Sequence, residues 1–171
     1  MKILSFDPSG NFVEGSGTTG WVLYYEDSIN SLGQIKSFDY TSQVDYWIAH
    51  MDLIKALEPD ILVVEEYVLY AHTTRAQIGS QMETVQLIGI LKYFAKLHNI
   101  EIVFQSARIK KRFNNEILLR KNILTQDVQR RYYAAGMPVS QHIIDAIRHG
   151  EFYKTFTRKK ALKWWYLNMY C

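Results

Sequence analysis

The sequence of 171 residues has few of the features that mark secreted or membrane proteins. Its one cysteine is Cys171, which excludes an intramolecular disulfide and a cysteine-rich zinc site and predicts a reducing, cytoplasmic location. No stretch approaches the roughly 20 apolar residues of a membrane helix, and the apolar start is too short for the core of a secretion signal. With 48% apolar and 22% charged residues, the chain is typical of one globular domain without a membrane partner.

Each part of the chain is poor in charge of one sign. Residues 1–104 hold 6 lysines and arginines against 13 acids, whereas residues 105–171 hold 14 against 4. The net charges of −7 and +10 indicate a surface for a polyanion on a protein that also carries a carboxylate cluster. Aromatic rings lie among the basic residues, as cations and rings do in proteins that bind nucleic acid. The alternatives are a solvated basic face and rings that belong to the core.

The hydrophobic pattern predicts an α/β fold with the element order β-β-β-α-β-α-β-α-α. Strands are expected at residues 2–6, 21–25, 35–40, 61–64 and 100–104. The fourth is an unbroken β-favouring apolar run, which is typical of a buried parallel strand. We therefore expect a mixed five-stranded sheet with helices on both faces, formed by a domain of residues 1–154 with a basic and aromatic tail at 155–171.

Four helical predictions concern particular faces and ends. The helix after Ser42 is expected to bury Val44, Trp47, Ile48, Met51 and Ile54. The helix at 75–98 is expected to bury Ile78, Met82, Val85, Ile88 and Leu91, with Gly79 and Gly89 packed closely on the sheet. Its outer face, with Gln77, Gln81, Leu87 and Phe94, is the predicted dimer interface. A further helix is expected from Thr125 to Gly136, then a linker at 137–139 and a last helix capped by Ser140.

Three carboxylates stand where strands or helices can direct them to one place. Asp7 ends the first strand and Glu65 the fourth, while Asp145 shares a helical face with His142 and His149. Such a cluster repels itself unless cations bind. Oxygen-rich sites suit Mg²⁺ or Mn²⁺, and two such ions can drive phosphodiester hydrolysis. The alternatives are a helix cap for Asp7, surface positions for the other acids and a structural role for His142.

These motifs, in this order and spacing, resemble the RuvC family of Holliday-junction resolvases within the ribonuclease H-like superfamily, with small phage members closest in appearance. The resemblance spans residues 2 to about 154 and is carried by Ile3–Pro8, Thr19–Trp21, Pro59–Glu66, the helix with Gly79 and Gly89, and His142–Ala146. It implies a homodimeric endonuclease that uses Mg²⁺ or Mn²⁺, two per active site, to nick junctions symmetrically. It also assigns the catalytic and metal-binding roles to Asp7, Glu65, His142 and Asp145.

The resemblance further implies contacts to branched DNA rather than to a small molecule. Where the family often carries an aromatic residue that meets bases, this chain has Val68, so Tyr67 and Tyr70 are the candidates for stacking. The family also uses basic residues beyond the fifth strand near the cleaved phosphate. The candidates for phosphate contacts are Lys110, Lys111, Arg112, Arg120, Lys121, Arg130 and Arg131. The turn after Asp7 is longer here than in the family.

Three other functions compete with a junction resolvase. One is a related nuclease that cuts RNA in hybrids or DNA during transposition, and another is a junction-binding protein without catalysis. The third is a phosphate-binding domain of the sugar-kinase or actin type, since Asp7 is followed by Gly17-Thr18-Thr19-Gly20. That fold needs two such domains, for which 171 residues are too few.

Overall fold

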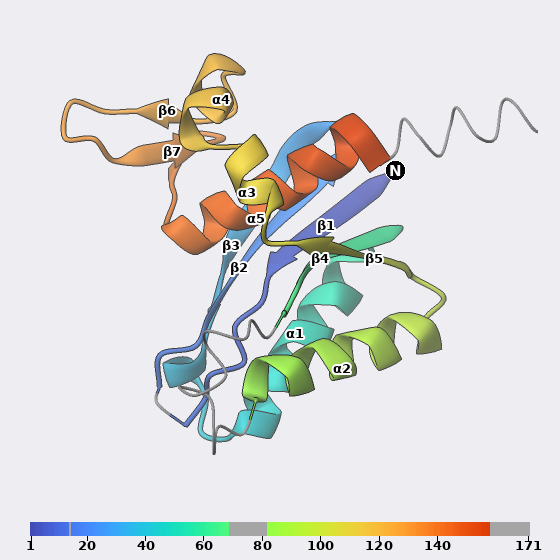
Figure 1. The fold of residues 1–171 in the computed structure, drawn as a ribbon. Helices are drawn as coiled ribbons and strands as arrows, with labels where there is room; N and C mark the ends of the chain where they lie inside the picture. Colours follow the sequence, from blue (N-terminus) through green and yellow to red (C-terminus); the bar gives the residue numbers. More distant parts are fainter. Residues whose placement is uncertain (14, 69–81, 158–171) are drawn as a thin grey trace, which may run out of the picture.

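The computed structural model describes residues 1–13, 15–68 and 82–157 (Figure 1). Its main sheet has five strands in the order β3-β2-β1-β4-β5, with β1 antiparallel to β2 and parallel to β4. The strands are β1 (Lys2–Asp7), β2 (Thr18–Tyr25), β3 (Ser28–Lys36), β4 (Ile61–Glu66) and β5 (Glu101–Ser106). The predicted five-stranded mixed sheet is confirmed.

Helices cover both faces of this sheet, also as predicted. On one face lie α1 (Gln43–Leu57) and α2 (Glu83–Leu97), and on the other lies α5 (Gln141–Phe152) (Figure 1). Because successive side chains of a strand point to opposite faces, β1 and β4 supply both cores. Leu4, Phe6, Leu62 and Val64 pack with α1 and α2, while Ile3 and Val63 pack with α5. The strand β4 is thus buried on both faces, as its apolar run predicts.

The third strand begins earlier than its sequence pattern suggests. A tight turn at Glu26 and Asp27, both with positive φ (48° and 71°), leads directly from β2 into β3. Turns of this hand match the twist of a hairpin. The predicted strand at 35–40 therefore covers only the end of β3, and the 3₁₀ helix Ser37–Asp39 follows it.

The buried face of α1 also differs from the prediction. Tyr46, His50 and Ile54 are buried, whereas Val44 and Ile48 are exposed. Tyr46 and His50 hydrogen-bond to Ser9 and Thr19, and polar groups with such partners can be buried. Ile54 is buried and Trp47 and Met51 pack against the core, as predicted, but a pattern based on apolar residues alone misses the two polar members of the buried face. The predicted capping of this helix by Ser42 is confirmed.

The interior face of α2 includes Ile88 and Leu91, as predicted, together with residues that were predicted on the outer face. Leu87 and Phe94 lie in the core, and Val85 is 42% exposed. Gly89 is exposed, and a β-carbon there would meet no described atom within 4 Å, so it does not serve close packing. The predicted outer face is wrong for Leu87 and Phe94, while Ile78, Gly79, Gln77 and Gln81 lie outside the described residues.

The segment predicted as a helix from Thr125 to Gly136 forms a small second sheet. Its strands are β6 (Thr125–Gln126), β7 (Tyr132–Ala134) and β8 (Met137–Pro138), the last of which replaces part of the predicted linker. The Asp127 carboxylate accepts the backbone N–H groups of Gln129 and Arg131 and so forms a turn in place of a helix. Two short helices, α3 (Ile109–Arg112) and α4 (Asn115–Arg120), connect β5 to this sheet.

The end of the described chain is helical. As predicted, Ser140 caps α5 by accepting the N–H of Ile143, and a π-helical turn, Tyr153–Thr157, follows. No helix of the described residues has the length and apolarity to cross a membrane. The greater part of the tail predicted at 155–171 lies outside the described residues.

Candidate active site

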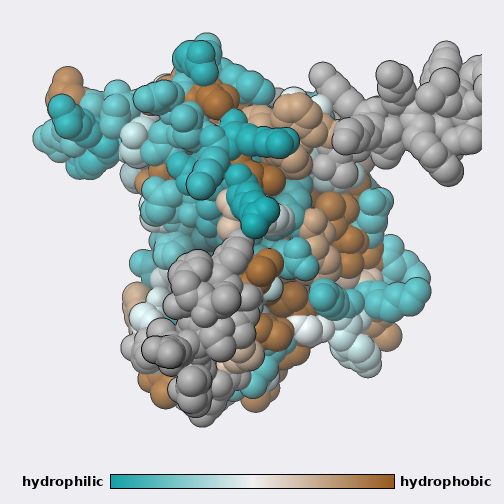
Figure 2. Space-filling view, in the orientation of Figure 1, coloured by the Kyte–Doolittle hydropathy of each residue, from teal (hydrophilic) through white to brown (hydrophobic). Residues whose placement is uncertain are grey.

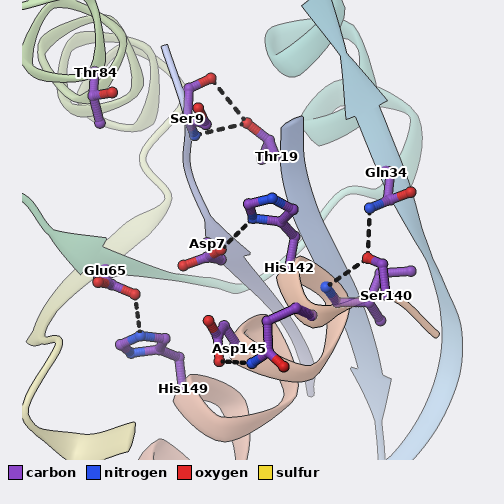
Figure 3. Close-up of polar contacts among 12 residues, drawn as sticks. Asp7, Ser9, Thr19, Gln34, Glu65, Thr84, Ser140, His142, Asp145 and His149 are labelled. Carbon is purple, nitrogen blue, oxygen red and sulfur yellow. Dashed lines mark hydrogen bonds and ion pairs between the residues drawn. The ribbon is translucent and has the colours of Figure 1, made fainter. Parts of the chain in front are cut away.

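Two carboxylates meet where β1 and β4 end. The register pairs Phe6 with Val64, so Asp7 and Glu65, the next residues along each strand, stand at the same sheet edge. The third carboxylate, Asp145, comes from α5, which covers the face of the sheet toward which Asp7 and Glu65 point (Figure 3). This helix approaches β2 closely, because a β-carbon on Gly20 would lie 2.1 Å from the backbone oxygen of His142. The predicted convergence of Asp7, Glu65 and Asp145 is therefore present.

The ammonium group of Lys110 lies between the three carboxylates. Its Nζ is 3.1 Å from Asp7 Oδ1, 2.7 Å from Glu65 Oε2 and 3.0 Å from Asp145 Oδ2. Burial opposes the charge on Lys110, but the three acids outweigh this effect and raise the pKa of the ammonium above its ordinary value. The lysine thus neutralises part of the negative charge of the cluster.

His142 lies beside this cluster rather than within it. Its Nδ1 is 3.0 Å from Asp7 Oδ2, and 45% of its side chain is exposed (Figure 3). The hydrogen bond to Asp7 raises the pKa of the imidazole, and burial only partly opposes the rise. His142 therefore approaches Asp7 through the oxygen that Lys110 does not contact.

Asp145 is held by two residues of its own helix, one of which is braced by α4. Gln141 Nε2 donates to Asp145 Oδ1 over 2.9 Å, and Arg148 also donates to this oxygen. Arg148 in turn bonds Asn115 at the start of α4 over 2.6 Å. These contacts bind Oδ1 and leave Oδ2 facing Lys110. They therefore fix the orientation of the carboxylate.

Glu65 has a buried partner on α5, one helical turn after Asp145. His149 Nε2 lies 2.8 Å from Glu65 Oε2, and the histidine side chain is fully buried. Burial opposes ionisation of Glu65, but the hydrogen bonds from His149 and Lys110 outweigh it and lower the pKa of this carboxyl below its ordinary value. Potential ligand atoms of Asp7, Glu65 and His149 lie within 4.8 Å of one another. His149, which is absent from the predicted set of metal ligands, therefore belongs to the geometry of the site.

The donor atoms of the site fit a hard divalent cation. Three carboxylate oxygens already surround one positive nitrogen at 2.7 to 3.1 Å, so a cation position exists between them. Oxygen ligands of this kind are those that Mg²⁺ and Mn²⁺ prefer. Asp7, Glu65 and Asp145 would hold the ion, and Lys110 would have to leave the position that the ion takes.

The predicted DNA-contacting residues occupy three different surroundings. Lys110 belongs to the carboxylate cluster, and Tyr67 lines a small pocket with Pro8 and Glu65. Tyr70 lies outside the described residues. The remaining candidates are exposed on the lobe formed by α3, α4, β6, β7 and β8, whose surface is largely hydrophilic (Figure 2). They are Lys111, Arg112, Arg120, Lys121, Arg130 and Arg131, the last of which forms a salt bridge with Asp127.

Three residues of the site were not among the candidates predicted from the sequence. Gln105 faces His149, and Gln141 and Arg148 hold Asp145. A signal for two of them exists, because Gln141 precedes Asp145 by four residues and Arg148 follows it by three, which are contact distances on a helix. Gln105 is paired with Glu65 in the sheet, which the sequence shows only once the strand register is known.

Comparison with known proteins relates the chain to solved structures. No protein-family model and no curated protein matches the sequence. The structure is similar to that of Thermus thermophilus RuvC in complex with a Holliday-junction substrate, with a TM-score of 0.67 and 13% identity over 94% of this chain and 96% of that one. A second Thermus thermophilus RuvC structure gives a TM-score of 0.61 and 15% identity, and covers 94% and 97%. The chain therefore has the ribonuclease H-like fold of RuvC, as the resemblance in sequence predicted.

Proposed function

We propose that this chain is a divalent-metal-dependent endonuclease that resolves four-way DNA junctions by paired, symmetric nicks. The observation that carries the proposal is the convergence of Asp7, Glu65 and Asp145 on one cation position at the ends of β1 and β4. The RuvC-like fold, one of whose examples holds a Holliday-junction substrate, supports the choice of substrate. The location that we propose is the cytoplasm, or the host cytoplasm if the chain is phage-encoded.

Each residue of the site has a definable task in this reaction. Bound Mg²⁺ or Mn²⁺, two per site, would activate water and stabilise the leaving oxygen. Asp7, Glu65 and Asp145 would hold these ions in place, and His142 would provide a further ligand at the exposed side of Asp7. Metal binding would displace the ammonium group of Lys110 from the carboxylates. Because its side chain is flexible, Lys110 could then pair with the phosphate that is cut, beside the metal site.

The exposed basic lobe supplies a surface for the arms of the junction. Lys111, Arg112, Arg120, Lys121 and Arg130 lie on it, and phosphate contacts by such residues provide most of the affinity of non-specific DNA binding. Tyr67 lies beside Glu65 and is the residue that we propose to stack on a base unpaired at the crossover, with Tyr70 as a second candidate.

Paired nicks require two active sites, so the active species is proposed to be a homodimer. The exposed apolar residues of α2 are Val85, Tyr93 and Leu97, which are 42%, 70% and 61% exposed. Leu87 and Phe94, which the sequence pattern placed on the interface, are buried in the core. We therefore propose Val85, Tyr93 and Leu97 as the apolar residues of this helix at the dimer interface.

Cleavage of defined substrates tests the proposal. A synthetic four-way junction, a duplex of the same sequence and an RNA–DNA hybrid are incubated with the protein, with Mg²⁺ or with EDTA. We expect symmetric nicks in the junction only, and only with Mg²⁺. Cleavage of the hybrid instead would identify the related nuclease activity, and junction binding without cleavage in Mg²⁺ and in Mn²⁺ would identify a binding protein.

A further inference from the structure

One oxygen of Glu65 accepts hydrogen bonds from two sides. Lys110 reaches Oε2 from the open side at 2.7 Å, and His149 reaches it from the buried side at 2.8 Å. A carboxylate oxygen has two lone pairs. The bond from His149 therefore directs the other lone pair of this oxygen toward the position of the cation.

Gln105 holds the His149 ring from the opposite end. Its Oε1 lies 3.1 Å from His149 Nδ1, and its Nε2 is buried with no hydrogen-bond partner among the described residues. Rotating this amide by 180° exchanges the two atoms, so Gln105 either accepts from a charged imidazole or donates to a neutral one. In both arrangements His149 Nε2 carries a proton, since ionised Glu65 can only accept.

We infer that Gln105 and His149 form a buried positioning pair that orients Glu65 for the metal. The inference rests on the proposed function, because it takes Glu65 to be a metal ligand. His149 itself is not a ligand here: its Nε2 faces Glu65, its Nδ1 faces Gln105, and the ring is fully buried. It acts through Glu65, as groups behind a ligand often do, and removal of such a group typically weakens metal affinity by about 10- to 100-fold.

The test measures Mn²⁺ binding to the full chain without DNA, by the electron paramagnetic resonance signal of free Mn²⁺. His149→Leu removes both hydrogen bonds at similar volume, and we expect it to weaken Mn²⁺ binding by about 10- to 100-fold. His149→Gln keeps an N–H that can reach Glu65, and should recover most of the affinity. Ile147→Ala is the matched control, because Ile147 is fully buried on the same helix among apolar residues. It should lower stability and leave Mn²⁺ affinity unchanged.

Two results would overturn the inference. One is a folded His149→Leu with the affinity of the parent, and the other is an equal loss of affinity in Ile147→Ala. If His149→Leu fails to melt cooperatively, Gln105→Leu replaces it with the same expected direction, since it releases the ring from behind, and unchanged affinity would overturn the inference again.

Junction cleavage by the parent protein keeps this inference separate from the proposed function. If the parent binds Mn²⁺ in a manner dependent on His149 but cuts no junction, the positioning pair is supported and the resolvase function is refuted. If the parent cuts junctions but the His149 and Gln105 variants bind Mn²⁺ normally, the resolvase function is supported and the positioning pair is refuted.

Discussion

Lys110 and Glu65 form the shortest of three ion pairs that join one lysine to the carboxylate cluster, with 2.7 Å between Nζ and Oε2. The lysine lies on α3, just after β5, and the glutamate lies near the end of β4, so the pair joins α3 to the sheet at the site. The protein thus carries its own cation at the position that we propose for the metal.

Replacing this internal cation should make the protein more dependent on metal. Lys110→Met leaves three carboxylates without their shared partner, so we expect it to lose about 2 kcal/mol of stability in EDTA, less than a fully buried pair would lose because Lys110 is partly exposed. For a chain of this size this is a fall of roughly 4 to 8 °C in Tm. Adding Mn²⁺ should raise the Tm of the variant more than that of the parent.

Thermal melts in EDTA and in Mn²⁺ measure both effects. Lys111→Met is the control, because Lys111 is exposed beside it and should behave as the parent. An equal Mn²⁺ response in parent and Lys110→Met would show that the lysine and the metal do not compete for one position.

Each of the three carboxylates should be needed for cleavage but not for DNA binding. We expect Asp7→Asn, Glu65→Gln and Asp145→Asn to lower the rate of junction cleavage by at least about 100-fold, the scale of losing one strong electrostatic contact in a transition state. Binding measured by gel shift should be retained, since the site loses negative charge. Glu66→Gln is the control, because Glu66 is exposed and strand alternation turns it away from Glu65; near-normal cleavage by any of the three variants would remove that residue from the site.

His142 should tolerate a carboxylate better than a methyl group. An aspartate at this position can still bind a hard cation beside Asp7, whereas alanine leaves the position without a ligand. We therefore expect His142→Asp to cleave junctions at least about tenfold faster than His142→Ala, measured at saturating Mn²⁺. Equal losses in both variants would indicate that the imidazole transfers a proton.

The buried histidine of α1 should make the protein less stable in mild acid. Burial lowers the pKa of His50 to about 4, below the ordinary value of 6.5. As the pH falls below about 6.5, the His50 side chain is protonated in the unfolded state but not in the folded state. The free energy of unfolding therefore declines until about pH 4, where the folded state also binds the proton. The loss reaches about 3 kcal/mol. Urea unfolding from pH 7 to 4 measures it, and His50→Gln should show a shallower decline; parallel curves would refute the assignment.

The basic lobe should determine the salt dependence of junction binding. If Arg120 and Lys121 contact phosphates, each substitution by alanine should reduce the slope of log K against log salt by roughly 0.9. Lys55→Ala is the matched control, because Lys55 lies on α1 and is exposed beside Asp52. Unchanged slopes in both lobe variants would place the DNA on another surface.

The sequence could predict the acids of the site because each follows a strong local pattern. Glu65 ends an unbroken apolar strand, and Asp145 is three residues from His142 on a helix. The resemblance implied that a basic residue beyond the fifth strand lies near the site, but the contact of Lys110 with three acids could not be predicted, because nothing local distinguishes it from its basic neighbours. Its placement depends on α3 packing beside α5.

The errors in the fold have a common physical origin. Tyr46 and His50 are buried because Ser9 and Thr19 satisfy their polar groups, and Asp127 forms a turn because its carboxylate accepts backbone N–H groups. Hydrogen bonds between residues therefore overrode apolar periodicity in α1 and helical propensity near Asp127. Such pairings are invisible until the partners are brought together.

The close approach of α5 to β2 at Gly20 has a consequence for the order of assembly. Asp7 and Glu65 belong to the first 65 residues, but Asp145 reaches them only when α5 docks against the sheet. A contact across that sequence separation carries a high loop-closure cost and forms late in folding. As the ribosome extends the chain, the sheet can therefore exist for some time with an incomplete set of carboxylates. The cleavage that we propose would then be withheld from every partly folded or unfinished copy, because the carboxylate cluster is complete only when the fold is.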